Sequence, residues 1–313
     1  MTEPRASGFW APYFASLKPL EVEEPIDVWV HRPPAYVLAR MLMPTAISPN
    51  MVTVGSILLG LCAGVLIFAQ FPHHLPIAGV LIFGSAVFDC ADGQLARMRK
   101  SSSAFGRMLD GVADLVATSV VIVGGAWLLI RKYEHSTWQL ALALGLAAVT
   151  IVTSSFHTTM YDQFKNSFLR MTHPSYREGE DVAVAEERHR AERAAQPLVI
   201  RLVWQIYLFY IRSQENYGKK FDPYAERLAR QFSFNPRNAA IYRKHAAAAM
   251  RVWRDFFGFG SLVFGLAVSI GCDITDYYLL FRLVVLNAIF YGYLRPAQRR
   301  ASERAFEEMA SAV

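Results

Sequence analysis

Long uninterrupted apolar stretches limit this sequence more than any other feature does. Six of them can cross a hydrocarbon core of about 30 Å, which takes about 20 helical residues at about 1.5 Å each. Because lipid offers the backbone no hydrogen-bond partner, each stretch should be a helix. The predicted spans are Met51–Gln70, Leu75–Ala91, Met108–Ile130, Trp138–Phe156, Val252–Gly271 and Tyr277–Gly292. The sequence therefore predicts an all-α polytopic membrane protein, a bundle of six transmembrane helices.

Composition and charge agree with this architecture. The chain is 53% hydrophobic and 19% charged, which excludes an intrinsically disordered protein. Lysine and arginine gather in alternate loops, and this places both termini on the cytoplasmic side of the cell inner membrane. The net charge of +6 then reflects topology and contact with anionic lipid, so no nucleic acid is needed to explain it. Residues 1–13 lack a basic segment followed by an apolar core, so no cleaved signal peptide is expected.

Polar segments divide the chain into five regions. The predicted regions are a cytoplasmic N-terminal segment (1–50) with an interfacial helix near Ile26–Ala46, spans one to four (51–171), a cytoplasmic or interfacial helical insert (172–250), spans five and six (251–295) and a cytoplasmic tail (296–313). Within the insert, Leu198–Ile211 is apolar but shorter than a span. It is predicted to be an interfacial or capping helix, with a re-entrant segment as the alternative.

Four aspartates flank the predicted turn between spans two and three. Asp89 and Asp92 lie at the end of span two, and Asp110 and Asp114 lie at the start of span three. Helical spacings of three and four place each pair on one face. Charges near a membrane are costly and usually functional. Four converging carboxylates would repel each other without a cation, and such all-oxygen ligands suit Mg²⁺, Mn²⁺ or Ca²⁺ better than zinc.

Small residues accompany these carboxylates. Gly93 and Ala96 follow Asp89 by four and seven positions, and Gly106 precedes Asp110 by four. They would leave a groove close to the backbone, beside which Arg97 supplies a positive charge suited to a phosphate. Each feature alone is typical of a turn, of helix packing or of an ion pathway. The combined pattern is more specific: Asp89-x-x-Asp92-Gly93-x-x-Ala96-Arg97, eight residues, then Gly106-x-x-x-Asp110-x-x-x-Asp114.

This pattern resembles the signature of the CDP-alcohol phosphotransferase family at every position. Ser48-Pro49-Asn50 and Thr53 also look like the opening of that family's first span, and the resemblance covers roughly Ile26–Tyr161. It implies a six-helix bundle entered by a surface helix, and a homodimer. It also implies an enzyme of phospholipid biosynthesis that transfers a substituted phosphate from a CDP-alcohol, with CDP-diacylglycerol favoured, to an alcohol acceptor and releases CMP.

The resemblance also implies roles for individual residues. Asp89, Asp92 and Asp110 would be the main ligands of Mg²⁺ (or Mn²⁺), with two ions expected. Asp114 would be the general base that takes the proton of the acceptor hydroxyl, and it would also contact the second ion. The nucleotide and diphosphate site would be formed by Gly93, Ala96, Arg97, Gly106, Asn50 and Thr53.

The acceptor pocket is less sharply indicated. Polar side chains gather at the inner end of span four and the start of span five, and interfacial anchoring is their simpler role. The candidate acceptor residues are Ser155, His157, Tyr161, Lys165 and Arg254. Arg282, within span six, is expected to pair with a structural partner.

Three other interpretations stay open. Membrane carboxylates also occur in cation and proton transporters, which would have no use for Arg97 or for the glycine spacing. A CDP-amino-alcohol or CDP-polyol donor with a lipid acceptor would use the same metal site. A catalytically silent relative could bind a partner protein through the insert, although all four aspartates are present.

Overall fold

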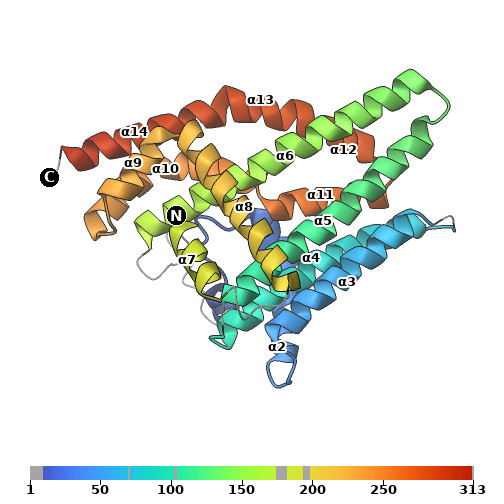
Figure 1. The fold of residues 1–313 in the computed structure, drawn as a ribbon, viewed down its shortest axis with the longest axis horizontal. Helices are drawn as coiled ribbons and strands as arrows, with labels where there is room; N and C mark the ends of the chain where they lie inside the picture. Colours follow the sequence, from blue (N-terminus) through green and yellow to red (C-terminus); the bar gives the residue numbers. More distant parts are fainter. Residues whose placement is uncertain (1–9, 70, 102–103, 174–181, 193–197, 312–313) are drawn as a thin grey trace. The chain divides into compact units, whose positions relative to one another are not determined.

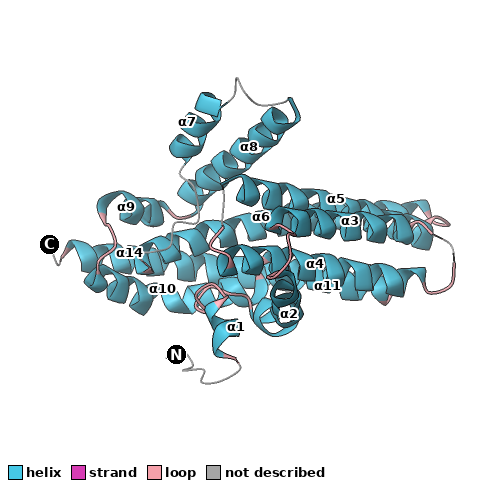
Figure 2. Ribbon diagram, turned by 90° about the horizontal axis from the view of Figure 1, so that it is seen from below, coloured by secondary structure: helices cyan, strands magenta, loops and turns pink. Residues whose placement is uncertain are grey.

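The computed structural model describes residues 10–69, 71–101, 104–173, 182–192 and 198–311, and these ranges contain helices and loops but no strand (Figures 1 and 2). For a few helical residues it describes the backbone alone: 104–108, 110–117, 120, 183, 184, 188, 192, 199 and 203. The predicted all-α class is confirmed. The chain forms two compact units, the first of residues 1–155 with 259–286 and the second of residues 156–258 with 287–313.

The first unit is built around long helices that run side by side. Its elements are α1 (Ala11–Ala15), η1 (Asp27–His31), α2 (Arg32–Leu42), α3 (Pro49–Ile67), α4 (His74–Met98), α5 (Ala104–Tyr133), the part of α6 (Thr137–Thr172) up to Ser155, α11 (Phe259–Gly271), α12 (Thr275–Phe281) and η3 (Arg282–Leu286). Ser48 begins α3, since its hydroxyl accepts a hydrogen bond from the Met51 amide at 3.3 Å and Pro49 fits the first helical position.

Close packing of small and polar residues joins α3 to α4. The hydroxyl of Ser56 donates to the Ser85 carbonyl at 3.0 Å, and the hydroxyl of Ser85 donates to the Ser56 carbonyl at 2.9 Å. Both serines are buried, so this reciprocal pair satisfies polar groups that lipid could not. A shared apolar core continues toward α5 and α11 and consists of Ala63, Ile67, Ala78, Ile82, Val121, Leu266, Ala267 and Ile270.

A buried carboxylate attaches the N-terminal segment to this unit. Glu24 is 5% exposed and accepts hydrogen bonds from the amides of Gly260 and Ser261, at 3.1 and 2.8 Å, and from the Ser261 hydroxyl at 2.9 Å. These amides belong to the first turn of α11, where a negative charge is stabilising. Next to Glu24, Glu23 pairs with the buried Arg32 at 3.0 Å. The segment before α2 is therefore held by amides and a hydroxyl from far along the chain, and by the nearby guanidinium of Arg32.

We expect this anchor to weaken as the pH rises. Burial, together with the nearby charge of Asp27, raises the pKa of Glu24 from 4.5 to about 8. Between these two values the folded state binds more protons than the unfolded state, so stability falls as pH increases. The thermal unfolding midpoint in detergent should decrease from pH 5 to pH 8, and the slope should flatten in Glu24→Gln. The exposed Glu134→Gln should keep the wild-type slope; an unchanged slope in Glu24→Gln would contradict the assignment.

The second unit surrounds an aromatic core. Its elements are the rest of α6, α7 (Val182–Glu192), α8 (Leu198–Phe221), α9 (Pro223–Gln231), α10 (Pro236–Phe256), α13 (Asn287–Ile289), η4 (Phe290–Leu294) and α14 (Arg295–Ala310). The Trp253 ring stacks on Phe164 with 5.3 Å between centroids and meets Phe290 edge-on at 5.8 Å. Its indole N–H donates to Gln298 at 3.1 Å, so α10 and α14 are joined by polar as well as apolar contacts.

A buried aspartate completes this core. Asp222 is fully buried and caps α9 by accepting from the amides of Tyr224 and Ala225, both at 3.1 Å. Its other oxygen accepts from the Ser302 hydroxyl at 2.6 Å and from Gln298 at 3.3 Å. Four donors satisfy the carboxylate, which explains how a charged side chain is accommodated there.

Five helical stretches of the described residues are long and apolar enough to cross a membrane. They are Pro49–Ile67, His74–Met98, Thr137–Thr172, Pro236–Gly271 and Thr275–Ala310. Four of the six predicted spans lie within these stretches, and a fifth, Met51–Gln70, overlaps the first of them up to Ile67. The remaining span, Met108–Ile130, falls on α5, where many side chains lie outside the described part. The count of six therefore stays a prediction, as do the five regional boundaries.

Several helices are longer than the sequence suggested. The predicted fourth span ends at Phe156, whereas α6 continues to Thr172, just before His173 and Pro174. The apolar Leu198–Ile211 is part of α8, which has 24 residues. An apolar stretch marks only the part of a helix that would lie in the lipid core. The helix itself can continue into polar sequence until a residue such as proline ends it. The interfacial position predicted for α8 is untested, as is that of η1 and α2.

Candidate active site

The C-terminal half of α4 presents the first two aspartates of the motif. Asp89 and Asp92 lie one helical turn apart; Asp92 is 7% exposed and Asp89 is partly buried. Ala91 and Leu95 lie on the other side of the same turn, where they pack into an apolar cluster with Ala35, Ala39 and Val52. Burial of these neighbours fixes the rotation of α4, and this determines where the carboxylates lie.

The start of α3 contributes a hydroxyl to this group. Thr53 donates a hydrogen bond to Asp92 Oδ2 at 2.5 Å, although the two residues are 39 positions apart. The Thr53 hydroxyl also lies 3.2 Å from the Pro49 carbonyl, so its place follows from the first turn of α3. The structure thus brings Thr53 to a predicted metal ligand. Asn50 lies one turn earlier on α3.

Arg97 is held by the N-terminal segment. Its Nε donates to the Ser16 carbonyl at 2.7 Å, and the neighbouring Gln94 donates to the Ser16 hydroxyl at 3.1 Å. A Cβ at Gly93 would lie 3.3 Å from Arg97 Nη1, so the guanidinium runs back along α4 over the glycine. Ser16 and Gln94 had no role in the sequence prediction, because nothing in the local pattern of a loop serine indicates a partner 81 residues away.

The second half of the motif lies on α5. Gly106, Asp110 and Asp114 follow one another at intervals of four on this helix, and their side chains lie outside the described part. Among the described side chains, no three His, Cys, Asp or Glu residues lie close enough to hold a metal ion. Asp89 and Asp92 are two of the four predicted ligands, and their oxygens are of the type that Mg²⁺ prefers.

The predicted acceptor residues lie in different surroundings. His157 is 1% exposed and enclosed by aromatic rings, with centroids 4.9 Å from Phe257 and 4.5 Å from Phe290. This enclosure gives the imidazole the surroundings of a core residue rather than of an open pocket. Ser155, which belongs to the first unit, is exposed.

The two cationic candidates have acidic neighbours. Lys165 bonds Asp162 at 2.5 Å and lies 4.9 Å from the centre of the Tyr161 ring. Arg254 bonds Asp255 at 2.8 Å. A bound phosphate would have to compete with these carboxylates, so the structure gives the acceptor assignment no direct support.

Comparison with known proteins tests whether the complete aspartate motif belongs to a known family. The profile of the CDP-alcohol phosphatidyltransferase family matches residues 46–207, which is more than half of the chain and includes all four aspartates. The chain belongs to this family. Family membership and the five apolar helices together point to an integral membrane protein.

Individual relatives match shorter parts of the chain. A stretch of 117 residues is 32% identical to phosphatidylinositol phosphate synthase of Corynebacterium glutamicum and covers 36% of this chain and 52% of that protein. A stretch of 104 residues is 36% identical to CDP-diacylglycerol–glycerol-3-phosphate 3-phosphatidyltransferase of Escherichia coli K12 and covers 33% of this chain and 54% of that protein. The chain thus spans about half the length of these curated relatives.

Proposed function

We propose that this protein transfers a phosphatidyl group from CDP-diacylglycerol to an alcohol acceptor and releases CMP, as an enzyme of phospholipid biosynthesis. The observation that carries the proposal is the complete aspartate motif inside the family match, with the α4 carboxylates partly to fully buried and Asp92 bonded to Thr53. The names of the two relatives, one of which states CDP-diacylglycerol as a substrate, support this donor.

The aspartates, the small residues of the motif and the polar candidate acceptor residues have different roles in this reaction. Asp89, Asp92, Asp110 and Asp114 hold two Mg²⁺ (or Mn²⁺) ions, which would offset charge on the diphosphate of the donor. Asp114 also takes the proton of the attacking hydroxyl, the acceptor oxygen bonds to the phosphorus of the phosphatidyl group, and the bond to CMP breaks. Arg97, Gly93, Ala96 and Gly106 line the nucleotide and diphosphate site with Asn50 and Thr53. The acceptor binds beside Ser155, His157, Tyr161, Lys165 and Arg254.

The proposal extends to membrane topology and assembly. Six spans, with α5 as the third, place both termini and the active site on the cytoplasmic side of the inner membrane. The distribution of lysine and arginine in the loops supports this orientation. The protein acts as a homodimer in contact with anionic lipid, an expectation that rests on the family resemblance and on the net charge of +6.

The decisive experiment is a CMP-release assay on the purified protein in liposomes. CDP-diacylglycerol is offered with glycerol 3-phosphate, inositol, inositol phosphate, serine or choline, and products are identified by mass. We expect one acceptor to give CMP and a phospholipid, with turnover lost in EDTA and restored by Mg²⁺. If a folded sample releases no CMP from CDP-diacylglycerol with any acceptor, the proposal fails; cation flux across sealed vesicles without nucleotide would favour a transporter instead.

A further inference from the structure

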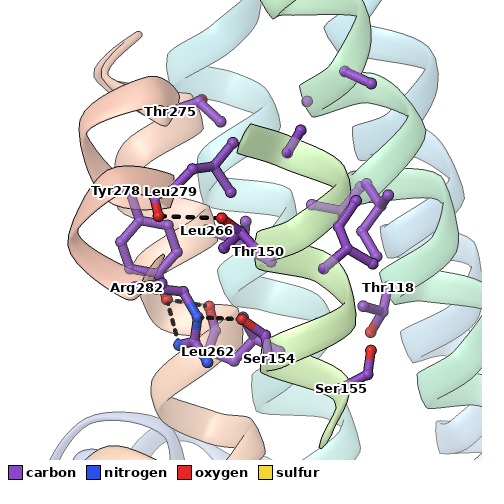
Figure 3. Close-up of a pocket in the computed structure, with 16 residues that line it drawn as sticks. Thr118, Thr150, Ser154, Ser155, Leu262, Leu266, Thr275, Tyr278, Leu279 and Arg282 are labelled. Carbon is purple, nitrogen blue, oxygen red and sulfur yellow. Dashed lines mark hydrogen bonds between the residues drawn. The ribbon is translucent and has the colours of Figure 1, made fainter. Parts of the chain in front are cut away.

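A cavity in the first unit contains several polar groups that, apart from Ser155, have no part in the proposed reaction. It lies between α5, α6, α11, α12 and η3 (Figure 3). Its volume is about 60 Å³. Its walls are largely aliphatic, from residues such as Val121, Ile122 and Leu266. The polar side chains that line it are Thr118, Thr150, Ser154, Ser155, Tyr278 and Arg282.

Arg282 is the most unusual of these side chains. It is 3% exposed and lies within Thr275–Ala310, one of the stretches able to cross a membrane. Its Nε donates to the Ser154 hydroxyl at 2.8 Å and its Nη1 to the Tyr278 hydroxyl at 3.1 Å (Figure 3). The third nitrogen, Nη2, is buried and has no hydrogen-bond partner among the described residues.

The charge of Arg282 is not balanced by its neighbours. A guanidinium stays protonated in proteins, and both of its hydrogen-bond partners are neutral hydroxyls. Its guanidinium also lies 5.7 Å from the centre of the Tyr278 ring, but none of the ion pairs found among the described residues includes Arg282. A lone cation in a membrane interior is costly unless an anion or water compensates it. The structural partner expected from the sequence is therefore present, but it supplies hydrogen bonds without negative charge.

Two further polar atoms at this cavity lack partners. Thr118 Oγ1 and Thr275 Oγ1 are buried without a hydrogen bond among the described residues, and both threonines line the cavity. Buried polar groups are satisfied in nearly all native proteins, so three such atoms around one cavity indicate an occupant. About 60 Å³ holds four to six water-sized groups, which is the size of a carboxylate or a phosphate but too small for a hydrocarbon chain.

We propose that this cavity binds the oxyanion of a single-chain amphiphile, a fatty carboxylate or an alkyl phosphate, with the anion on Arg282 Nη2 and the chain outside the cavity in the lipid. The aliphatic walls and the position within three candidate membrane stretches favour an occupant that arrives through the bilayer. A free inorganic anion would have to shed its water to reach the same guanidinium. The residue that would bind the anion, Arg282, is not among those assigned to the transferase reaction.

The test measures equilibrium binding of radiolabelled dodecyl phosphate to the full-length protein in phosphatidylcholine nanodiscs, with empty nanodiscs as the blank. We expect saturable binding that weakens at least about tenfold in Arg282→Gln, the loss typical of one charge-assisted hydrogen bond. Arg282→Lys should recover part of the affinity. Arg131→Gln removes an exposed arginine from the same unit and should bind like wild type. Dodecanol should not compete, and inorganic phosphate should compete only at far higher concentration.

A second variant keeps the test valid if Arg282→Gln fails to fold. Gly125 lines the cavity, and a Cβ there meets only Thr275 Cγ2, at 3.8 Å. Gly125→Leu should therefore fill the cavity and weaken binding while the hydrogen bonds of Arg282 and the unfolding midpoint stay unchanged. Binding that is unaltered in Arg282→Gln and Gly125→Leu overturns the proposal. An absence of saturable binding overturns it as well, since water or the chain's own groups then compensate the charge of Arg282. If inorganic phosphate competes as well as dodecyl phosphate does, the occupant is a free anion and the proposal of an amphiphile is wrong.

Discussion

Replacement of Asp92 by asparagine should reduce CMP release by about 10²- to 10³-fold while the protein stays folded. Removal of one preorganised electrostatic contact to a reacting group typically costs that much. Asparagine has the same shape, and its oxygen can still accept the hydrogen bond from Thr53, which is 2.5 Å from Asp92 Oδ2 in the structure. The variant therefore removes the charge that would bind Mg²⁺ and leaves the contact between α3 and α4.

The matched control makes the same chemical change at a position without a role in the site. Asp273 is exposed in the turn after α11, with φ of 55°, a conformation that asparagine adopts readily. Asp273→Asn should retain wild-type turnover. Initial rates of CMP release at several Mg²⁺ concentrations, together with the unfolding midpoint, distinguish the two variants. Turnover above half of the wild-type value in Asp92→Asn would rule out the proposed metal site.

Gly79→Ala should strongly destabilise the first unit, although it adds only a single methyl group. A Cβ at Gly79 would lie 2.6 Å from the backbone oxygen of Ala267 and 3.0 Å from the Cα of Gly271, both on α11. Neither is the flexible end of a side chain, so α4 and α11 would have to separate. Overpacking of this kind costs about 1–3 kcal/mol and sometimes more. The unfolding midpoint in detergent should fall by several degrees.

Gly145→Ala is the corresponding control on α6. No atom lies within 4 Å of a Cβ built there. Alanine also favours a helix over glycine by about 0.5–1 kcal/mol, so this variant should be as stable as wild type or slightly more stable. If both glycine variants have the same midpoint, then close approach of α4 and α11 does not limit the stability of this unit.

The sequence by itself determined the helical class, five of the membrane-crossing stretches and the motif that the family profile matches. Each of these is local or nearly local information. Runs of apolar residues about 20 long predict a span whatever surrounds them, and spacings of three and four place Asp89 and Asp92 on one face of α4 because a helical turn has about 3.6 residues. Lengths of helices were less predictable, since α6 continues sixteen residues beyond Phe156, to Thr172.

Tertiary structure alone decided which distant groups meet. Thr53 bonds Asp92 across 39 positions, Ser16 holds Arg97 across 81, and Glu24 caps α11 through Ser261 across 237. It also enclosed His157 in aromatic rings and left Arg282 beside a cavity with neutral partners. Periodicity gives the direction of a side chain relative to its own helix. Which residue that side chain contacts depends on how the helices pack. Packing in turn depends on shape complementarity and on hydrogen bonding of buried polar groups throughout the unit.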